Sequence, residues 1–297
     1  MLSLLFRAQL VIQIIEFHCG VLFQNIWIFI RNAHYFMRIC GNAVPVQTWG
    51  YGSEISLLEN IADEHLCCII RSRTKHPGVE AKRAWLRDQL ASGHVFRKLN
   101  ARGTCFIEYA PLDAAWTPIV GDNYYYIYCL WVLPPFRGHG YGAELLNYCI
   151  DDARRAGASG VCMLGADRQR AWLSDQNFAR THGFKTVDKT NNGYELLALS
   201  FDGTVPHFPD AVKSPHIDTD TLTIFYDDQC PYMAQTIDMV REYCAKHNVP
   251  VNLHHVDSIT AAKSLPCVFN NFAVFYRGAF QTVNLLTADA LARILSE

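Results

Sequence analysis

The sequence predicts an α/β protein in which two folded regions follow an apolar N-terminal segment. Strand-like and helix-like patterns alternate from about residue 54, a glycine-rich turn joins one strand directly to a helix, and a Pro-rich connector is followed by a second alternating region. The predicted parts are, in chain order, an extension, a first domain, a linker and a second domain: 1–48, 49–203, 204–219 and 220–297.

The first domain is expected to be a mixed α/β region of eleven elements. Asn60 is a suitable N-cap, Gly93 follows a helical apolar pattern, and 100–103 are turn residues between two strand-like runs. The elements are expected in the order strand, helix, helix, three strands, helix, strand, helix and two strands: 55–58, 60–71, 79–92, 95–99, 104–109, a strand from 124, a helix to about 156, 161–164, 175–182, 184–187 and 194–201.

The composition is that of a globular protein with little net charge. The 297 residues suffice for two domains of about 100 to 200 residues each. Half of the residues are apolar and the net charge is -2, so no basic field favours nucleic acid or an anionic membrane. The 11 cysteines are scattered in apolar segments without C-x-x-C or zinc spacing, which favours a reducing, cytoplasmic compartment and predicts no metal site.

The N-terminal extension is apolar, and its structure is left open. Its longest uncharged run, 17–30, is shorter than the roughly 17 to 25 residues of a membrane span, and no signal-peptide cleavage site follows it. An interfacial amphipathic helix, an appended helix and an extension without function are all compatible with this pattern. No clear membrane association is therefore predicted.

The stretch 124–142 organises the first domain. An aromatic and β-branched run ends at a Pro-Pro pair, and a turn with the sequence RGHGYG (137–142) then opens a helical pattern. Glycines let backbone N–H groups approach a diphosphate, and the helix dipole adds positive potential. The turn lacks the G-K-[ST] ending of a P-loop and the G-x-G-x-x-G spacing of a dinucleotide site, so the alternatives are another diphosphate site or a turn without ligand.

The turn fits R-x-x-G-x-G, and with the order of elements over 54–202 it resembles the GCN5-related N-acetyltransferase (GNAT) superfamily. The resemblance implies the GNAT fold with a mixed central sheet, acetyl-CoA as cofactor, and direct attack of an amine of a small molecule or peptide on the thioester. It also implies the residues that contact the cofactor: Leu130, Val132, Leu133, Arg137, Gly138, His139, Gly140, Tyr141 and Gly142.

The residues that handle protons are less well defined by the sequence. Many members of the superfamily carry a tyrosine at the position of Ala179, as acid for the departing thiolate. Glu108 is the best acidic candidate here, with Cys129 and Tyr128 as polar alternatives. Glu108 is equally compatible with an exposed hairpin position, and Cys129 with a small apolar core residue.

The second domain follows an order of strand, helix, strand, helix, two strands and helix, which resembles the thioredoxin fold. Its elements are expected at 222–226, 234–247, 251–256, 261–262, 272–276, 279–282 and 288–296. The run Cys230-Pro231-Tyr232 resembles a glutaredoxin-type thiol site, where a helix N-terminus would stabilise the thiolate. Met233 stands where a second cysteine would be, and Pro266 is the candidate for the cis-proline of that fold.

The two domains together resemble the YoaP-like acetyltransferases, and the stretches at 129–132 and 273–280 add to this resemblance. Two functions are compatible with it. The first is an acetyl-CoA-dependent N-acetyltransferase. The second is a CoA-binding or thiol-dependent module without acetyl transfer, in which Cys230 serves in a redox reaction or in docking.

Overall fold

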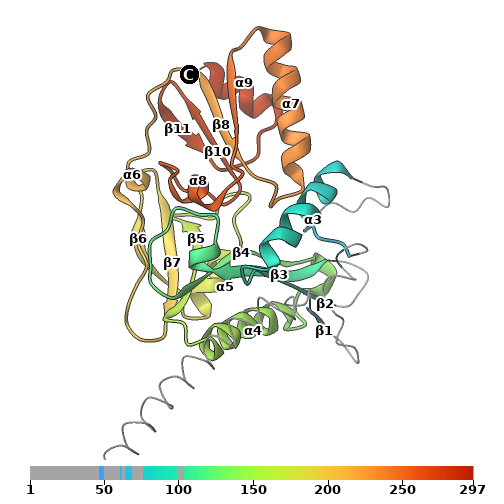
Figure 1. Ribbon diagram of the computed structural model, residues 1–297, viewed down its shortest axis with the longest axis vertical. Helices are drawn as coiled ribbons and strands as arrows, with labels where there is room; N and C mark the ends of the chain where they lie inside the picture. Colours follow the sequence, from blue (N-terminus) through green and yellow to red (C-terminus); the bar gives the residue numbers. More distant parts are fainter. Residues whose placement is uncertain (1–46, 50–60, 62–63, 69–75, 100–103, 297) are drawn as a thin grey trace, which may run out of the picture. The chain divides into compact units, whose positions relative to one another are not determined.

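The computed structural model describes residues 47–49, 61, 64–68, 76–99 and 104–296 (Figure 1). The predictions for the extension before residue 47, the strand at 55–58 and the turn at 100–103 lie outside the described residues.

The first region is built on a mixed seven-stranded sheet. Its strand order is β1-β2-β3-β4-β5-β7-β6, with β1 parallel to β2, β4 parallel to β5 and the remaining pairs antiparallel. The strands are β1 (Gln47–Trp49), β2 (Val95–Leu99), β3 (Cys105–Pro111), β4 (Tyr124–Val132), β5 (Gly160–Ala166), β6 (Lys185–Lys189) and β7 (Tyr194–Ser200). This is the mixed sheet that the sequence predicts.

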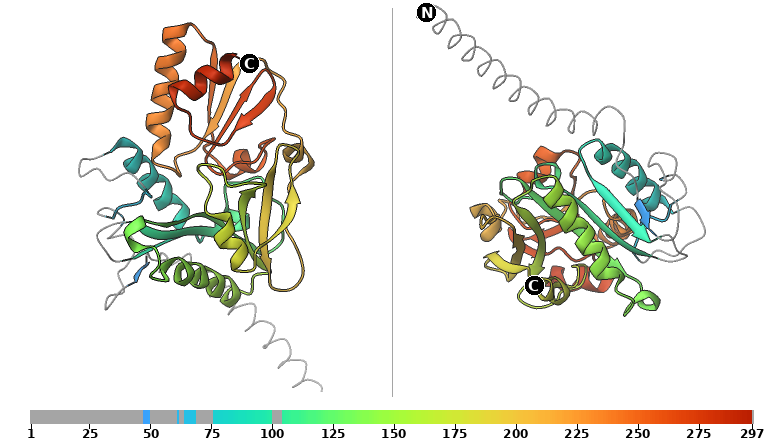
Figure 2. Two further views of the ribbon diagram at one scale, coloured as in Figure 1. Left: turned by 180° about the vertical axis from the view of Figure 1, so that it is seen from behind. Right: turned by 90° about the horizontal axis from the view of Figure 1, so that it is seen from below.

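Helices cover both faces of this sheet. α3 (Pro77–Leu90) and α4 (Tyr141–Arg155) lie on opposite faces of β2–β4 (Figures 1 and 2), and the shorter α5 (Gln176–Thr181) follows β5. α4 has one apolar face, and this face packs on the core residues of β3, β4 and β5. Its five buried residues are Leu145, Leu146, Cys149, Ile150 and Ala153.

The second region is a four-stranded sheet with helices. The strand order is β11-β10-β8-β9, with β8 parallel to β9 and the other pairs antiparallel. Its elements are β8 (Leu222–Tyr226), α7 (Tyr232–His247), β9 (Val251–His255), α8 (Ile259–Lys263), β10 (Phe272–Tyr276), β11 (Ala279–Thr282) and α9 (Ala288–Ser296). They follow the predicted order, and the thioredoxin-like interpretation of this region stays a prediction. Pro266 follows a trans peptide bond, because the described part has no cis bond.

The prediction of a helix at 60–71 is wrong for the residues of this range that the structure describes, 61 and 64–68. Residues 64–68 are irregular. Arg83 donates to the carbonyl oxygens of Ile61 and Glu64, at 2.5 and 3.2 Å, and the Thr104 hydroxyl donates to that of Cys68 at 2.7 Å. Side chains from other segments therefore take carbonyls that a helix would pair internally.

The Pro-rich connector is packed along the first region. It contains the short helix α6 (Asp210–Lys213), and the backbones of Val120 and His207 exchange two hydrogen bonds of 2.9 and 2.8 Å. Among the described residues, no helix is long and apolar enough to cross a membrane.

Candidate active site

The turn before α4 forms one end of a cavity of about 700 Å³. Gly138 and Gly140 have φ of +80° and +82°, and a Cβ on either would meet no atom within 4 Å. The backbone conformation, and not a lack of space, therefore favours glycine at both positions. Gly140 immediately precedes α4, so the N–H groups of the first helical turn, which have no acceptor within the helix, lie beside the cavity.

Most of the predicted cofactor residues line this cavity. Seven of the nine do so: Leu130, Val132, Arg137, Gly138, Gly140, Tyr141 and Gly142. Leu133 and His139 are not among the lining residues. The N–H of Leu133 is instead paired with the carbonyl oxygen of Thr104 at 3.0 Å, which explains why its backbone is not available there.

β4 separates from β5 halfway along its length. The two strands pair from Tyr124 to Ile127 and no further, although β4 continues to Val132. A bulge lies at the same point, because Glu108 of β3 is opposite Cys129 while the next β3 residue is opposite Ile127. Tyr128 is thus the extra residue, and the bulge turns the end of β4 away from its neighbour.

Side chains bind the backbone groups exposed by this separation. The N–H of Leu130 donates to the Ser174 hydroxyl at 3.1 Å, and the Asn270 amide donates to the carbonyl oxygen of Tyr128 at 3.4 Å. Ser174 belongs to the loop before α5, whereas Asn270 belongs to the second region. A ligand with its own acceptor could replace the hydroxyl at Leu130.

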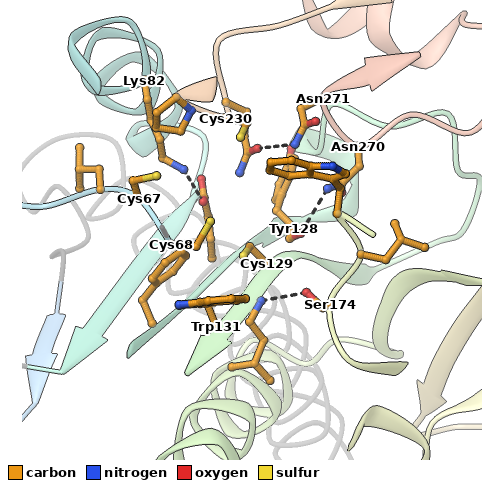
Figure 3. Close-up of a pocket in the computed structure, with 18 residues that line it drawn as sticks. Cys67, Cys68, Lys82, Tyr128, Cys129, Trp131, Ser174, Cys230, Asn270 and Asn271 are labelled. Carbon is orange, nitrogen blue, oxygen red and sulfur yellow. Dashed lines mark hydrogen bonds and ion pairs between the residues drawn. The ribbon is translucent and has the colours of Figure 1, made fainter. Parts of the chain in front are cut away.

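A second cavity of about 260 Å³ adjoins the first (Figure 3). The two share four lining residues, Leu130, Trp131, Leu173 and Ser174. The remaining walls come from several segments of both regions: Leu66, Cys67, Cys68, Lys82, Phe106, Glu108, Tyr128, Cys129, Trp172, Gln229, Cys230, Pro231, Asn270 and Asn271. The second cavity therefore exists only where the two regions meet.

Buried polar contacts hold the two regions together around this cavity. The Thr117 hydroxyl donates to the carbonyl oxygen of Phe269 at 2.9 Å, and the Tyr126 hydroxyl donates to the Asn270 amide oxygen at 2.6 Å. The start of α3 also touches the second region, since a Cβ added to Gly78 would collide with the carbonyl oxygen of Pro231.

The interpretation of Glu108 as an exposed hairpin residue is wrong. Its side chain is 0% exposed, Lys82 Nζ lies 2.5 Å from Oε2, and His94 Nε2 lies 3.0 Å from Oε1. Burial raises the pKa of this carboxyl, but Lys82 and His94 outweigh burial and hold it below its usual range. Glu108 is therefore an ionised carboxylate with both oxygens already bound.

Sequence reasoning missed the two partners of this carboxylate. Lys82 lies three residues after Val79 and three before Trp85, on the apolar face of the predicted helix, and that unusual position was the available signal. His94 gave no signal. Burial lowers the pKa of its imidazole despite Glu108, so the ring is neutral near pH 7.

The other two catalytic candidates are protonated groups. Tyr128 is buried and its hydroxyl oxygen accepts from the Trp116 N–H at 2.7 Å, while burial raises its pKa well above 10. Burial likewise raises the pKa of the Cys129 thiol. Ala179 is a buried core residue and holds no acid at the position where many superfamily members have tyrosine.

The expectation of a stabilised thiolate at Cys230 is wrong. Cys230 lies two residues before α7, and burial raises its pKa to about 12, although a backbone hydrogen bond at Tyr232 acts in the opposite direction. The thiol is directed into the second cavity (Figure 3), while Met233 is buried in the core beneath α7. The free-energy cost of burying a thiolate here exceeds the stabilisation that the helix N-terminus gives it.

Comparison with known proteins identifies the class. Residues 58–184 match the acetyltransferase (GNAT) family, and residues 250–293 match the YoaP-like family. The chain belongs to the GNAT acetyltransferases, and specifically to those with a YoaP-like C-terminal region. It is an acyltransferase, and acetyl-CoA is the co-substrate of its family.

A relative similar along most of the chain is a Bacillus subtilis (strain 168) protein described as the uncharacterized N-acetyltransferase YoaP. It is 32% identical over 240 residues, which cover 80% of this chain and 96% of the relative.

Solved structures with some likeness are more distant. A GNAT family acetyltransferase from Brucella melitensis in complex with acetyl-CoA is 16% identical, with 52% of this chain and 91% of that one covered and a TM-score of 0.32. The ribosomal-protein-S18-alanine N-acetyltransferase from Escherichia coli is 15% identical, with 41% and 79% covered and a TM-score of 0.30. Such values carry no argument about substrate.

Proposed function

We propose that the protein transfers the acetyl group of acetyl-CoA to a primary amine of a small molecule or peptide bound in the second cavity. One observation carries the proposal. A cavity that ends at a helix N-terminus meets a smaller cavity at Leu130, where the backbone N–H donates to the Ser174 hydroxyl.

In this proposal the turn at 137–142 and the first turn of α4 bind the diphosphate of acetyl-CoA. The pantetheine arm follows the free edge of β4 beyond Ile127, where no strand pairs with it. The thioester carbonyl oxygen replaces the Ser174 hydroxyl as acceptor for the Leu130 N–H, which then stabilises the negative charge of the tetrahedral intermediate.

The reaction needs few charged groups. The amine nitrogen attacks the carbonyl carbon, a C–N bond forms, the C–S bond breaks, and the electron pair leaves with sulfur. The thiolate takes up the proton that nitrogen loses. Holding amine and thioester together in adjoining cavities is a large part of the catalysis, because alignment can be worth about 7–11 kcal/mol.

Glu108, Cys129 and Tyr128 are proposed as the protein groups beside the acceptor amine, since all three line the second cavity. Glu108 is already paired with Lys82 and His94, so its proposed role is to accept a hydrogen bond that orients the amine. Tyr128 and Cys129 keep their protons and act as neutral hydrogen-bonding walls.

Calorimetric titration of the full chain with acetyl-CoA tests the cofactor site. We expect micromolar binding that weakens at least 100-fold in the variant Arg137→Ala/Gly140→Glu, because a cation and the anion-binding turn are both lost. A matched control is Arg241→Ala/Gly203→Glu, in which the glycine also has positive φ and open space but lies at the end of the first domain, away from the cavity lining. Wild-type protein that does not bind acetyl-CoA would overturn the proposal.

A further inference from the structure

The second cavity, proposed above to hold the acceptor amine, is called the acceptor cavity from here on. The described residues that line it carry no net charge. Lys82 and Glu108 form its one ion pair at 2.5 Å, with side chains 3% and 0% exposed. His94 holds the other carboxylate oxygen, and its ring is 1% exposed and packed against Trp85 and Tyr128. The only carboxylate in the wall is therefore neutralised by an equally buried cation.

The other ionisable side chains among the described lining residues are four thiols and one phenol. Four reduced cysteines from three segments line the cavity: Cys67, Cys68, Cys129 and Cys230 (Figure 3). Below the wall, in the second region, Asp227 is 0% exposed. One oxygen accepts from the Gln229 N–H at 2.9 Å, and the other has no partner among the described residues. A carboxyl in such a place keeps its proton, and burial raises its pKa well above the usual value.

Aromatic rings make up much of the rest of the wall. Phe106, Tyr128 and Trp131 come from β3 and β4. Trp172, from the loop before α5, is 41% exposed, has φ of +66° and meets Tyr232 of the second region edge-on at 5.4 Å. A left-handed backbone at a tryptophan is uncommon, so packing at the cavity entrance has fixed this position against local preference.

We propose that the acceptor is an amine that is uncharged near neutral pH and is attached to an aromatic body, such as an arylamine or an aryl hydrazide. This inference rests on the proposed function and specifies the substrate class of the same site. An ammonium ion would enter a neutral apolar cavity without a counter-charge, which is unfavourable. An arylamine enters uncharged, and its ring packs on the aromatic wall.

The chemistry of acetyl transfer agrees with this class. An alkylamine with a lysine-like pKa of ~10.4 is neutral in about one molecule in a thousand near pH 7.4, and only that form attacks. Among the described residues that line the wall, the one carboxylate, Glu108, is already paired with Lys82 and His94 and is not free to remove the extra proton. An arylamine needs no deprotonation before attack, and the proton it loses afterwards balances the CoA thiolate.

Steady-state CoA release by the full chain, with aniline and benzylamine as matched acceptors, tests the inference. The two differ by one methylene group and by charge at pH 7. For aniline we expect kcat/KM to be independent of pH between 6.5 and 9. For benzylamine we expect kcat/KM to rise about tenfold per pH unit up to the pKa of the amine itself, and to be lower than that of aniline at pH 7. A flat profile for benzylamine, with kcat/KM at pH 7 equal to or above that of aniline, would overturn the inference.

A charge added to the wall gives a second, independent measurement. Gln229→Glu keeps the oxygen that accepts from Asn271 at 3.1 Å and adds one carboxylate. Calorimetry on the CoA-loaded protein should show benzylamine binding at least tenfold tighter in this variant, with aniline changed less than threefold. Gln281→Glu, outside the cavity, is the control and should change neither affinity.

The failure of the two proposals can be told apart. Wild-type protein that binds acetyl-CoA but neither binds nor acetylates aniline or benzoyl hydrazide would overturn the substrate class alone. Wild-type protein that does not bind acetyl-CoA would remove the proposed function itself.

Discussion

The two adjoining cavities differ in how the chain builds them. The first cavity, proposed to bind acetyl-CoA and called the cofactor cavity from here on, is lined by residues from two short segments of the first region, 130–143 and 169–178. The acceptor cavity draws on segments from Leu66 to Asn271, which include strands of the first region and loops of the second. One cavity depends on local backbone geometry, whereas the other depends on how the second region docks. Changes to docking should therefore alter acceptor use and stability while they leave acetyl-CoA affinity intact.

The largest expected loss of stability comes from breaking the buried ion pair between Lys82 and Glu108. Glu108→Gln leaves Lys82 charged and unpaired in a fully buried position, which should lower the free energy of unfolding by about 3–5 kcal/mol. Urea denaturation measures this loss. The double variant Lys82→Met/Glu108→Gln should recover most of it, because no buried charge is then left alone. Equal stability of the single variant and the wild type would show that the pair is not isolated from water.

A smaller effect is expected where α3 touches the second region. Gly78→Ala would normally stabilise a helix by roughly 0.5–1 kcal/mol. Here the added Cβ collides with the carbonyl oxygen of Pro231, so we expect destabilisation of about 1–3 kcal/mol and loss of acceptor turnover. Ala84→Ser on the exposed side of the same helix is the control. Thermal unfolding measures the loss of stability, and calorimetry with acetyl-CoA checks that the cofactor cavity is unaffected. A stabilised Gly78→Ala variant would contradict the contact between α3 and the second region.

The smallest effect concerns Asp227, beneath the acceptor cavity. Its pKa is raised in the folded state, so its contribution to stability is fully present below the unfolded pKa of ~3.9 and is lost as pH rises towards the folded pKa. Asp227→Asn removes this loss and should be more stable than wild type at pH 7, by on the order of 1 kcal/mol or more, but not at pH 3.5. Urea denaturation at both pH values checks this. Asp228→Asn, on the partly exposed neighbour, is the control, and a pH-independent difference for Asp227→Asn would contradict a protonated Asp227.

Much of the fold could be predicted from the sequence, because the relevant patterns are local. The helix over Tyr141–Arg155 has its apolar residues at helical spacing and follows a glycine with positive φ. The strand over Tyr124–Val132 is rich in aromatic residues and ends before prolines. The helix expected at 60–71 was wrong because distant partners, Arg83 and Thr104, bind its carbonyls, and no local pattern reports such partners.

The family, the mixed sheet and the turn at 137–142 could all be predicted from the sequence, since each depends on residues close together in the chain. Three properties could not be predicted from the sequence: the burial and pairing of Glu108, the protonated thiol of Cys230 at the second cavity, and the hydrogen bond from the Leu130 N–H to the Ser174 hydroxyl. These properties follow from burial and from contacts between segments that are distant in the chain. Thr117 and Phe269, for example, are hydrogen-bonded across a separation of 152 residues. Desolvation and ion pairing depend on which distant groups surround a side chain, so its charge state is fixed by the fold and not by its neighbours in sequence.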